Sequence, residues 1–204
     1  MAYNGGQIAL STEFARSGRT SLRSIVTSPG EGIGSTGVAR RTGSLPKEAY
    51  YSAWYYVPEP MTGGQYWLFF KFRSRTAATD PATAVEVWDF DFNAHGDGTM
   101  GVFLYHNDTG DRVPLSSPLV PLRRWFQVEA FFRAAGDATG RLELWFDGTL
   151  IYDITEPTVP SDYVEWQVGG VAEFISPVGS TLFVDDAAIS TERLGPDYPV
   201  FWRP

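Results

Sequence analysis

The chain has 204 residues, a length that all-β proteins commonly fold as one domain. Sixteen Lys and Arg against 24 Asp and Glu give a formal net charge of −8, which argues against a nucleic-acid partner or an anionic membrane surface. Cysteine is absent, so disulfides, zinc–cysteine sites and thiol nucleophiles are excluded. No run of about 18 apolar residues occurs, and we therefore expect no membrane insertion.

Short segments in which apolar and polar residues alternate recur along the chain, and Gly, Pro, Asn or Asp closes each of them. The clearest predicted strands are Ser21–Thr27, Ala49–Val57, Gln65–Arg73, Val85–Asn93, Gly101–His106, Trp125–Arg133, Arg141–Phe146, Thr149–Ile154, Val164–Val168 and Thr181–Ser190. No segment has helical periodicity of adequate length. The pair Asp147-Gly148 predicts a tight hairpin, and the glycine-rich stretch Gly30–Gly37 is expected to be a surface loop.

This pattern predicts an all-β protein, an antiparallel β-sandwich of two packed sheets. We expect a single domain over residues 1–204, with about 195–204 forming a C-terminal tail or the start of a linker. We expect the chain to be a module of a larger secreted or surface protein, with an extracellular or cell-surface location.

Alternation also predicts which side chains point away from the core. If the strands lie in one sheet, a single exposed face combines aromatic rings with charged and amide side chains. Flat rings suit the C–H faces of sugars, and amides, carboxylates and guanidinium groups suit their hydroxyls. The predicted ligand-binding residues are Trp67, Lys71, Arg73, Asp89, Asp91, Gln127, Glu129, Arg133, Arg141, Glu143 and Trp145.

Four segments carry a resemblance to a known superfamily: Ser17–Arg23, Trp125–Glu129, the hairpin Leu144–Ile151 and Leu182–Ser190. Together they resemble the concanavalin A-like jelly rolls, and within that superfamily the heparin-lyase-like and laminin-G-like modules. The resemblance implies two curved sheets with a glycan on the concave face or at one edge. Because the superfamily holds both binding modules and enzymes, it leaves the function open.

The main interpretation is a carbohydrate-binding, lectin-like module that stacks sugar rings on Trp67 and Trp145. The first alternative is a polysaccharide lyase acting on uronates, which needs a donor to neutralise the carboxylate and a base for the C5 proton. Its candidate catalytic residues are Lys71, His106 and Arg133. The Gln-x-His pair of related lyases is missing from Phe69–Arg73, the strand matched to it.

Two further alternatives differ in class. A retaining glycosidase needs a pair of carboxylates on one face, but simple alternation turns Glu86 away from Asp89 and Asp91. A structural or adhesive module would carry no glycan site at all. The resemblance also implies a structural calcium ion, with Asp185 or Asp186 and Glu13 as ligands, since jelly-roll modules commonly hold one with hard oxygen donors.

Overall fold

The computed structural model describes residues 1–27, 34–42, 45–64, 66–76, 85–160 and 163–198, and these contain strands but no helix. Accordingly, no helix of the described part is long and apolar enough to cross a membrane. The strands are β1 (Ala2–Tyr3), β2 (Gln7–Ser11), β3 (Ser21–Val26), β4 (Ser35–Arg41), β5 (Glu48–Tyr56), β6 (Tyr66–Arg75), β7 (Val85–Ala94), β8 (Met100–His106), β9 (Gly110–Arg112), β10 (Trp125–Arg133), β11 (Arg141–Phe146), β12 (Thr149–Thr155), β13 (Tyr163–Glu173) and β14 (Ser180–Ser190).

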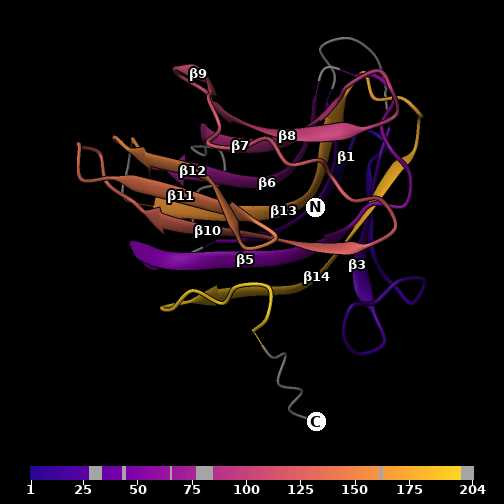
Figure 1. The fold of residues 1–204 in the computed structure, drawn as a ribbon, viewed down its shortest axis with the longest axis horizontal. Coiled ribbons are helices and arrows are strands. Elements are labelled where there is room, and N and C mark those ends of the chain that lie inside the picture. Colours follow the sequence, from indigo (N-terminus) through magenta and orange to yellow (C-terminus); the bar gives the residue numbers. More distant parts are fainter. Residues whose placement is uncertain (28–33, 43–44, 65, 77–84, 161–162, 199–204) are drawn as a thin grey trace.

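The strands form two seven-stranded antiparallel sheets that pack into a sandwich (Figure 1). Sheet A has the order β1-β4-β13-β6-β7-β8-β9, and sheet B has the order β12-β11-β10-β5-β14-β3-β2. Neighbours in each sheet come from distant parts of the chain, as where β13 lies between β4 and β6. The predicted all-β sandwich is confirmed, and all ten predicted strands are present.

Aromatic side chains fill the space between the sheets. Phe72 of sheet A stacks on Phe132 of sheet B with ring centroids 4.1 Å apart and planes 11° from parallel. Tyr51 of sheet B meets Trp166 of sheet A edge to face at 5.4 Å. Such pairs contribute about 0.5–1.5 kcal/mol beyond the burial of their area, so the packing fixes the two sheets relative to one another.

Residues 35–37 belong to β4, so the prediction of a loop over Gly30–Gly37 is wrong for its described end. The glycine at position 37 made the segment look like a loop, but it has another cause: a Cβ there would lie 2.3 Å from the carbonyl oxygen of Gln7. Glycine is therefore required in β4 by the close approach of the backbone of β2 in the other sheet, where the sequence suggests a turn. Residues 30–33 lie outside the described part.

The hairpin at Asp147-Gly148 forms between β11 and β12, as predicted. Both residues have positive φ, 46° for Asp147 and 79° for Gly148, which a two-residue turn of this type requires. The Asp147 carboxylate also accepts the backbone N–H of Gln127 at 2.8 Å, which ties the turn to β10.

Two β-bulges change which side chains of sheet A face outward. In β6 an extra residue at Phe69 shifts the pairing with β7, so Trp67, Phe69 and Phe70 all point into the core. In β7 an extra residue at Val87 does the same, so Val87 is buried and Glu86 faces outward. Lys71 and Arg73 still face outward as predicted, because they follow the first bulge.

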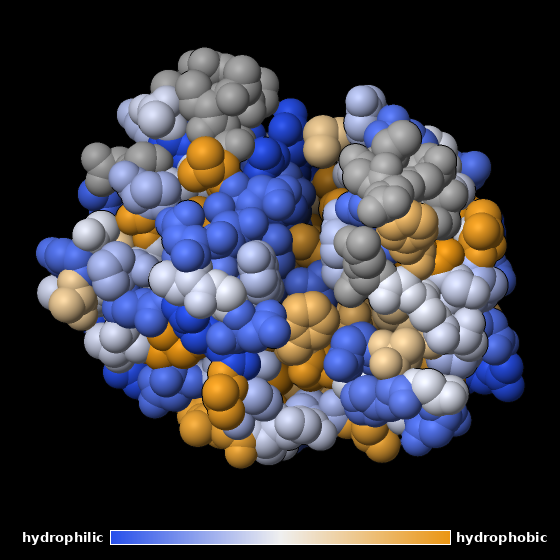
Figure 2. All heavy atoms as spheres, turned by 90° about the horizontal axis from the view of Figure 1, so that it is seen from above, coloured by the Kyte–Doolittle hydropathy of each residue, from blue (hydrophilic) through white to orange (hydrophobic). Residues whose placement is uncertain are grey.

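Seen from above, the surface is divided by a furrow with hydrophilic atoms gathered along one flank (Figure 2). Polar side chains point outward from sheet A, and the candidate functional site lies among them.

Candidate functional site

The outer face of sheet A is hollowed into a groove of about 600 Å³. Its lining residues come from four neighbouring strands and from β13, and they are Tyr66, Leu68, Lys71, Glu86, Asp89, Asp91, Phe103, Tyr105, Asn107, Asp111 and Val171. Polar and aromatic groups thus share one concave surface, the usual form of a ligand site.

One row of directly paired residues crosses this face from strand to strand. It runs through Arg40, Gln167, Lys71, Asp89, Tyr105 and Asp111, each the register partner of the next. Neighbouring strands lie about 4.8 Å apart, so the row presents one side chain per strand at nearly even spacing. We call it the cross-strand row.

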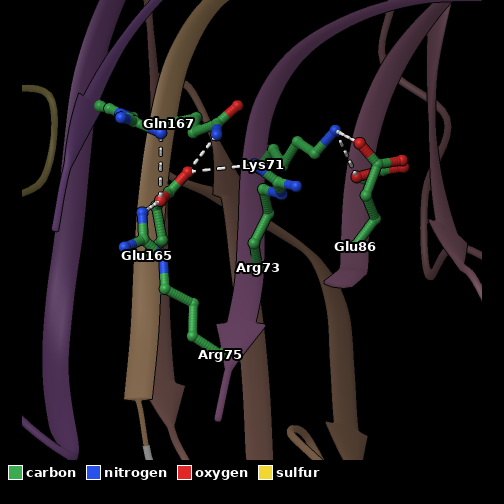
Figure 3. Close-up of polar contacts among 8 residues, drawn as sticks. Lys71, Arg73, Arg75, Glu86, Glu165 and Gln167 are labelled. Atoms are coloured by element: carbon green, nitrogen blue, oxygen red, sulfur yellow. Dashed lines mark hydrogen bonds and ion pairs between the residues drawn. The ribbon is translucent and has the colours of Figure 1, made fainter. Parts of the chain in front are cut away.

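A buried carboxylate organises the β13 side of this face. Glu165 is fully buried, and it accepts hydrogen bonds from Arg75, from Arg73 Nη1 at 3.4 Å and from Gln167 Nε2. Arg40 Nη1 lies 3.9 Å from it. Figure 3 shows Arg73 and Arg75 of β6 and Gln167 of β13 converging on Glu165. Glu165 therefore sets where the guanidinium and amide groups point.

Lys71 reaches the other way, toward β7 (Figure 3). Its side chain is 3% exposed, its ammonium forms an ion pair with Glu86, and it lies 3.9 Å from Asp89 Oδ1. Asn107 Nδ2 donates to the other oxygen of Asp89 at 3.2 Å. The ammonium is thus held at the centre of the groove between β6 and β7.

Two carboxyls of β7, those of Asp89 and Asp91, have raised pKa values. Burial raises the pKa of Asp89 to about 6, although the Lys71 ammonium acts in the opposite direction. Burial, and then the charge of Asp89, raises the pKa of Asp91 well above its usual range. Perturbed groups of this kind in a groove are typical of functional sites, although structural ion pairs produce them as well.

Two phenols lie on opposite sides of these carboxyls, Tyr66 on β6 and Tyr105 on β8. Burial, followed by the charges of Glu173 and Glu86, raises the pKa of Tyr66 to about 12. Tyr66 therefore keeps its proton at neutral pH.

The predicted single binding face is wrong, because the strands belong to two sheets. Lys71, Arg73, Asp89 and Asp91 lie on the outer face of sheet A. The others lie on sheet B: Gln127, Glu129, Arg133, Arg141, Glu143 and Trp145. Trp67 belongs to neither set, since the bulge at Phe69 turns it into the core, where it is 0% exposed and packs against Phe92.

The candidate lyase residues are likewise separated. His106 is the register partner of Trp88 and packs edge to face on its buried ring, on the side of β8 opposite Tyr105. Burial, and then the charge of Arg112, lowers the pKa of His106. Arg133 lies on sheet B and pairs with Glu48 at 2.6 Å. Of the three, only Lys71 lies in the groove.

The chain's own C-terminal segment, residues 191–198, covers part of the sheet B face. Glu129 is fully buried and accepts the backbone N–H groups of Leu194 at 2.7 Å and Gly195 at 3.0 Å. Arg193 lies over the Trp145 ring at 4.5 Å, and Gln127 donates to the carbonyl of Gly195 at 3.1 Å. The described part of the expected tail, residues 195–198, therefore begins at Gly195, which contacts sheet B. Residues 199–204 lie outside the described part.

The remaining sheet B residues are engaged with one another, since Arg141 pairs with Glu143 and lies 3.1 Å from Asp153. A sugar reaching Gln127, Glu129 or Trp145 would have to displace the C-terminal segment. Their role in binding remains a prediction.

The residues expected to hold calcium have other partners. Asp185 accepts the backbone N–H groups of Arg16 at 2.9 Å, Ser17 at 3.2 Å and Asp186 at 2.8 Å. Asp186 pairs with the Arg16 guanidinium at 2.5 Å, and the Ser17 hydroxyl donates to it. A guanidinium and amide donors at these oxygens do not fit a cation there. Across the described ranges no three His, Asp or Glu residues form a metal-binding group, and Glu13 is exposed.

Sequence reasoning missed Glu86 and Tyr105, which line the groove, and Glu165 and Gln167, which lie on the same sheet face beside it. Alternation within the predicted strand Val164–Val168 already places Glu165 and Gln167 on one face. That this strand lies beside Lys71 depends on a pairing between residues nearly one hundred positions apart, which alternation does not reveal.

No protein-family model matches the chain, and no curated protein matches it. Several solved structures are similar to it. An endo-β-1,4-glucuronan lyase from the fungus Trichoderma reesei has a TM-score of 0.74 at 16% identity, covering 98% of this chain and 94% of that one. The cellulose-induced protein Cip1 has a TM-score of 0.65 at 16% identity, covering 94% and 88%. A marine alginate lyase from Aplysia kurodai has a TM-score of 0.55 at 11% identity, covering 91% and 87%.

These similarities concern the fold. The chain is a β-sandwich of two antiparallel sheets, and its fold is similar to those of the solved glucuronan and alginate lyases. The resemblance seen in the sequence is confirmed at that level.

Proposed function

We propose that the protein is a polysaccharide lyase that cleaves a uronate-containing polysaccharide by β-elimination in the groove of sheet A. The observation that carries the proposal is that the Lys71 ammonium and the phenols of Tyr66 and Tyr105 line one groove, with the amide of Gln167 beside Lys71 in the neighbouring strand. The shared fold with glucuronan and alginate lyases supports the same reaction class over the lectin-like interpretation.

The uronate carboxylate is held beside the Lys71 ammonium between β6 and β7, with Arg73 and Gln167 on the β13 side of the same sheet face. Positive charge and N–H donors there stabilise the enolate that forms when the C5 proton leaves. Glu165 orients Arg73 and Gln167, so the receptor exists before the substrate arrives.

Tyr105 is the proposed base, because the cross-strand row places it two strands from Lys71 with Asp89 between. As the phenolate it takes the C5 proton and becomes the neutral phenol, the electron pair of the C–H bond forms the C4–C5 double bond, and the bond from C4 to the glycosidic oxygen breaks. Tyr66, the second phenol that lines the groove, gives its proton to the departing oxygen.

The test measures ultraviolet absorbance of the C4–C5 double bond, together with the chain length of the polymer. We expect unsaturated products from the wild type, and turnover slowed by about 100-fold or more in Tyr105→Phe and Tyr66→Phe. Glu143→Gln on sheet B is the matched control and should turn over as fast as the wild type. Polymer that binds the protein but stays intact would refute the lyase and restore the binding-module interpretation.

A second candidate function rests on the bulge at Val87. It brings Glu86, Asp89 and Asp91 to one face, so the sequence-based reason for rejecting a glycosidase is wrong. Glu86 and Asp89 both lie within reach of the Lys71 ammonium, so the three groups meet on one face of the groove. Hydrolysis would give new reducing ends without unsaturation, and the same assay separates the two reactions.

A polysaccharide substrate places the reaction outside the cell, since such polymers belong to cell walls and matrices. Secretion, and membership of a larger secreted protein, remain part of this proposal.

A further inference from the structure

A second row of paired residues runs through the groove beside the cross-strand row, and all but one of its members are apolar. Each member is the register partner of the next, and the row consists of Val171, Leu68, Asp91 and Phe103. All four residues line the groove. Alternate residues of a strand lie about 7 Å apart, so this row is displaced by that distance from Asp89 and Tyr105. The groove therefore has a polar flank and an apolar flank.

Asp91 is the exception in the second row, because its carboxyl lies between Leu68 and Phe103. The residue is 3% exposed, and its Oδ1 is buried and accepts no hydrogen bond. Its neighbour Asp89, by contrast, accepts the Asn107 amide at 3.2 Å. A buried carboxylate that lacks donors is costly, whereas the uncharged acid loses much less on burial. The surroundings of Asp91 therefore favour its protonated form.

The charged groups around Asp91 act mainly in the same direction. Burial is the largest cause of its raised pKa and the charge of Asp89 is the next, while the Lys71 ammonium opposes them. The titratable groups that line the groove with it come from four strands: Glu86 and Asp89 of its own β7, Tyr66 and Lys71 of β6, Tyr105 of β8 and Asp111 of β9. Asp91 thus keeps its proton to a higher pH than an ordinary aspartic acid does.

We propose that Asp91 is a specificity-determining residue that meets the polysaccharide as an uncharged acid, donating its O–H to a sugar oxygen, and that its ionised form repels a uronate. This inference deepens the proposed function and rests on it, because it takes the uronate to bind in the same groove. Uronate binding and protonation of Asp91 then favour each other, since linkage is reciprocal. Affinity for a uronate is full while Asp91 is protonated, and it falls as the pH rises through the pKa of that carboxyl.

The test measures binding by isothermal titration calorimetry in the Tyr105→Phe background, so that the ligand stays intact. The two ligands are a tetrasaccharide of β-1,4-linked glucuronate and cellotetraose, which share a backbone and differ in the charge at C6. Both are titrated at about pH 7 and about pH 9, above the pKa of Asp89, which is about 6. We expect the Kd of the glucuronate ligand to rise about fivefold or more over this range, and that of cellotetraose to change less than about twofold.

Two substitutions of Asp91 separate its charge from its hydrogen bond. Asp91→Asn keeps an N–H donor but does not ionise, so it should reduce the rise in Kd to below about twofold. Asp91→Leu continues the apolar row without a donor and should weaken both ligands about fivefold at pH 7. Asp153→Asn on sheet B changes the net charge as Asp91→Asn does, and it should leave the rise in Kd as it is in the parent.

The outcomes separate this inference from the function beneath it. A rise in Kd that Asp91→Asn and Asp153→Asn change equally, or the absence of any rise, overturns the inference, and so does a failure of the glucuronate ligand to bind at either pH. The lyase is judged separately, by the unsaturated product that the wild type forms. Product together with pH-independent binding overturns the role of Asp91 alone, whereas no product overturns the proposed function itself.

Discussion

Replacing Glu165 with Gln tests whether one buried carboxylate holds the cationic side of the groove together. The substitution keeps the shape of the side chain but removes its charge, and it turns an NH₂ group toward donors. Glu165 is 0% exposed, while Arg75 is 4% and the Arg73 side chain 18% exposed. Breaking a buried ion pair by removing one partner costs about 3–5 kcal/mol. Because Arg73 and Arg75 keep other contacts, we expect the lower end, about 3 kcal/mol.

Urea unfolding followed by tryptophan fluorescence measures this loss. With a slope of about 2 kcal/mol/M, the midpoint should fall by about 1.5 M. Glu143→Gln is the control: its carboxylate also pairs with an arginine, but Arg141 is 35% exposed, so the loss should stay below about 1 kcal/mol. Equal, small losses in the two variants would refute the central role of Glu165.

Three further predictions concern the acids, the C-terminal segment and the expected metal. Because the pKa of Asp89 is raised from 3.8 to about 6, its protonated form stabilises the fold fully below about pH 4, and this contribution is lost as the pH rises through 6. Wild type should therefore lose about 2–3 kcal/mol relative to Asp89→Asn between about pH 4 and 6, measured by urea unfolding; a constant difference would contradict the shift. Arg193→Ala removes the contacts with Glu129, Trp145 and Gly148. It should speed proteolysis after Ser190, whereas unchanged cleavage would show that backbone contacts alone hold the segment. Because Arg16 already pairs with Asp186, calcium should not raise the melting temperature over that in chelator, and a rise of several degrees would restore the calcium prediction.

The sequence by itself determined the class of fold and the hairpin. Alternating segments closed by turn residues specify strands, and Asp147-Gly148 supplies the positive φ values of a tight turn, because both signals depend on neighbours in the chain. For the same local reason, alternation correctly placed Lys71, Arg73, Asp89 and Asp91 outward.

The tertiary structure decided which strands share a sheet, and therefore the site. Pairing of β13 with β6 brings Glu165 and Gln167 to Arg73 and Lys71, and it depends on packing between distant segments. Two single-residue bulges moved Trp67 inward and Glu86 outward, because the period of two makes each extra residue reverse the faces that follow. The composition of one strand does not reveal the register of its neighbour, so the groove became visible only when the sheet was assembled.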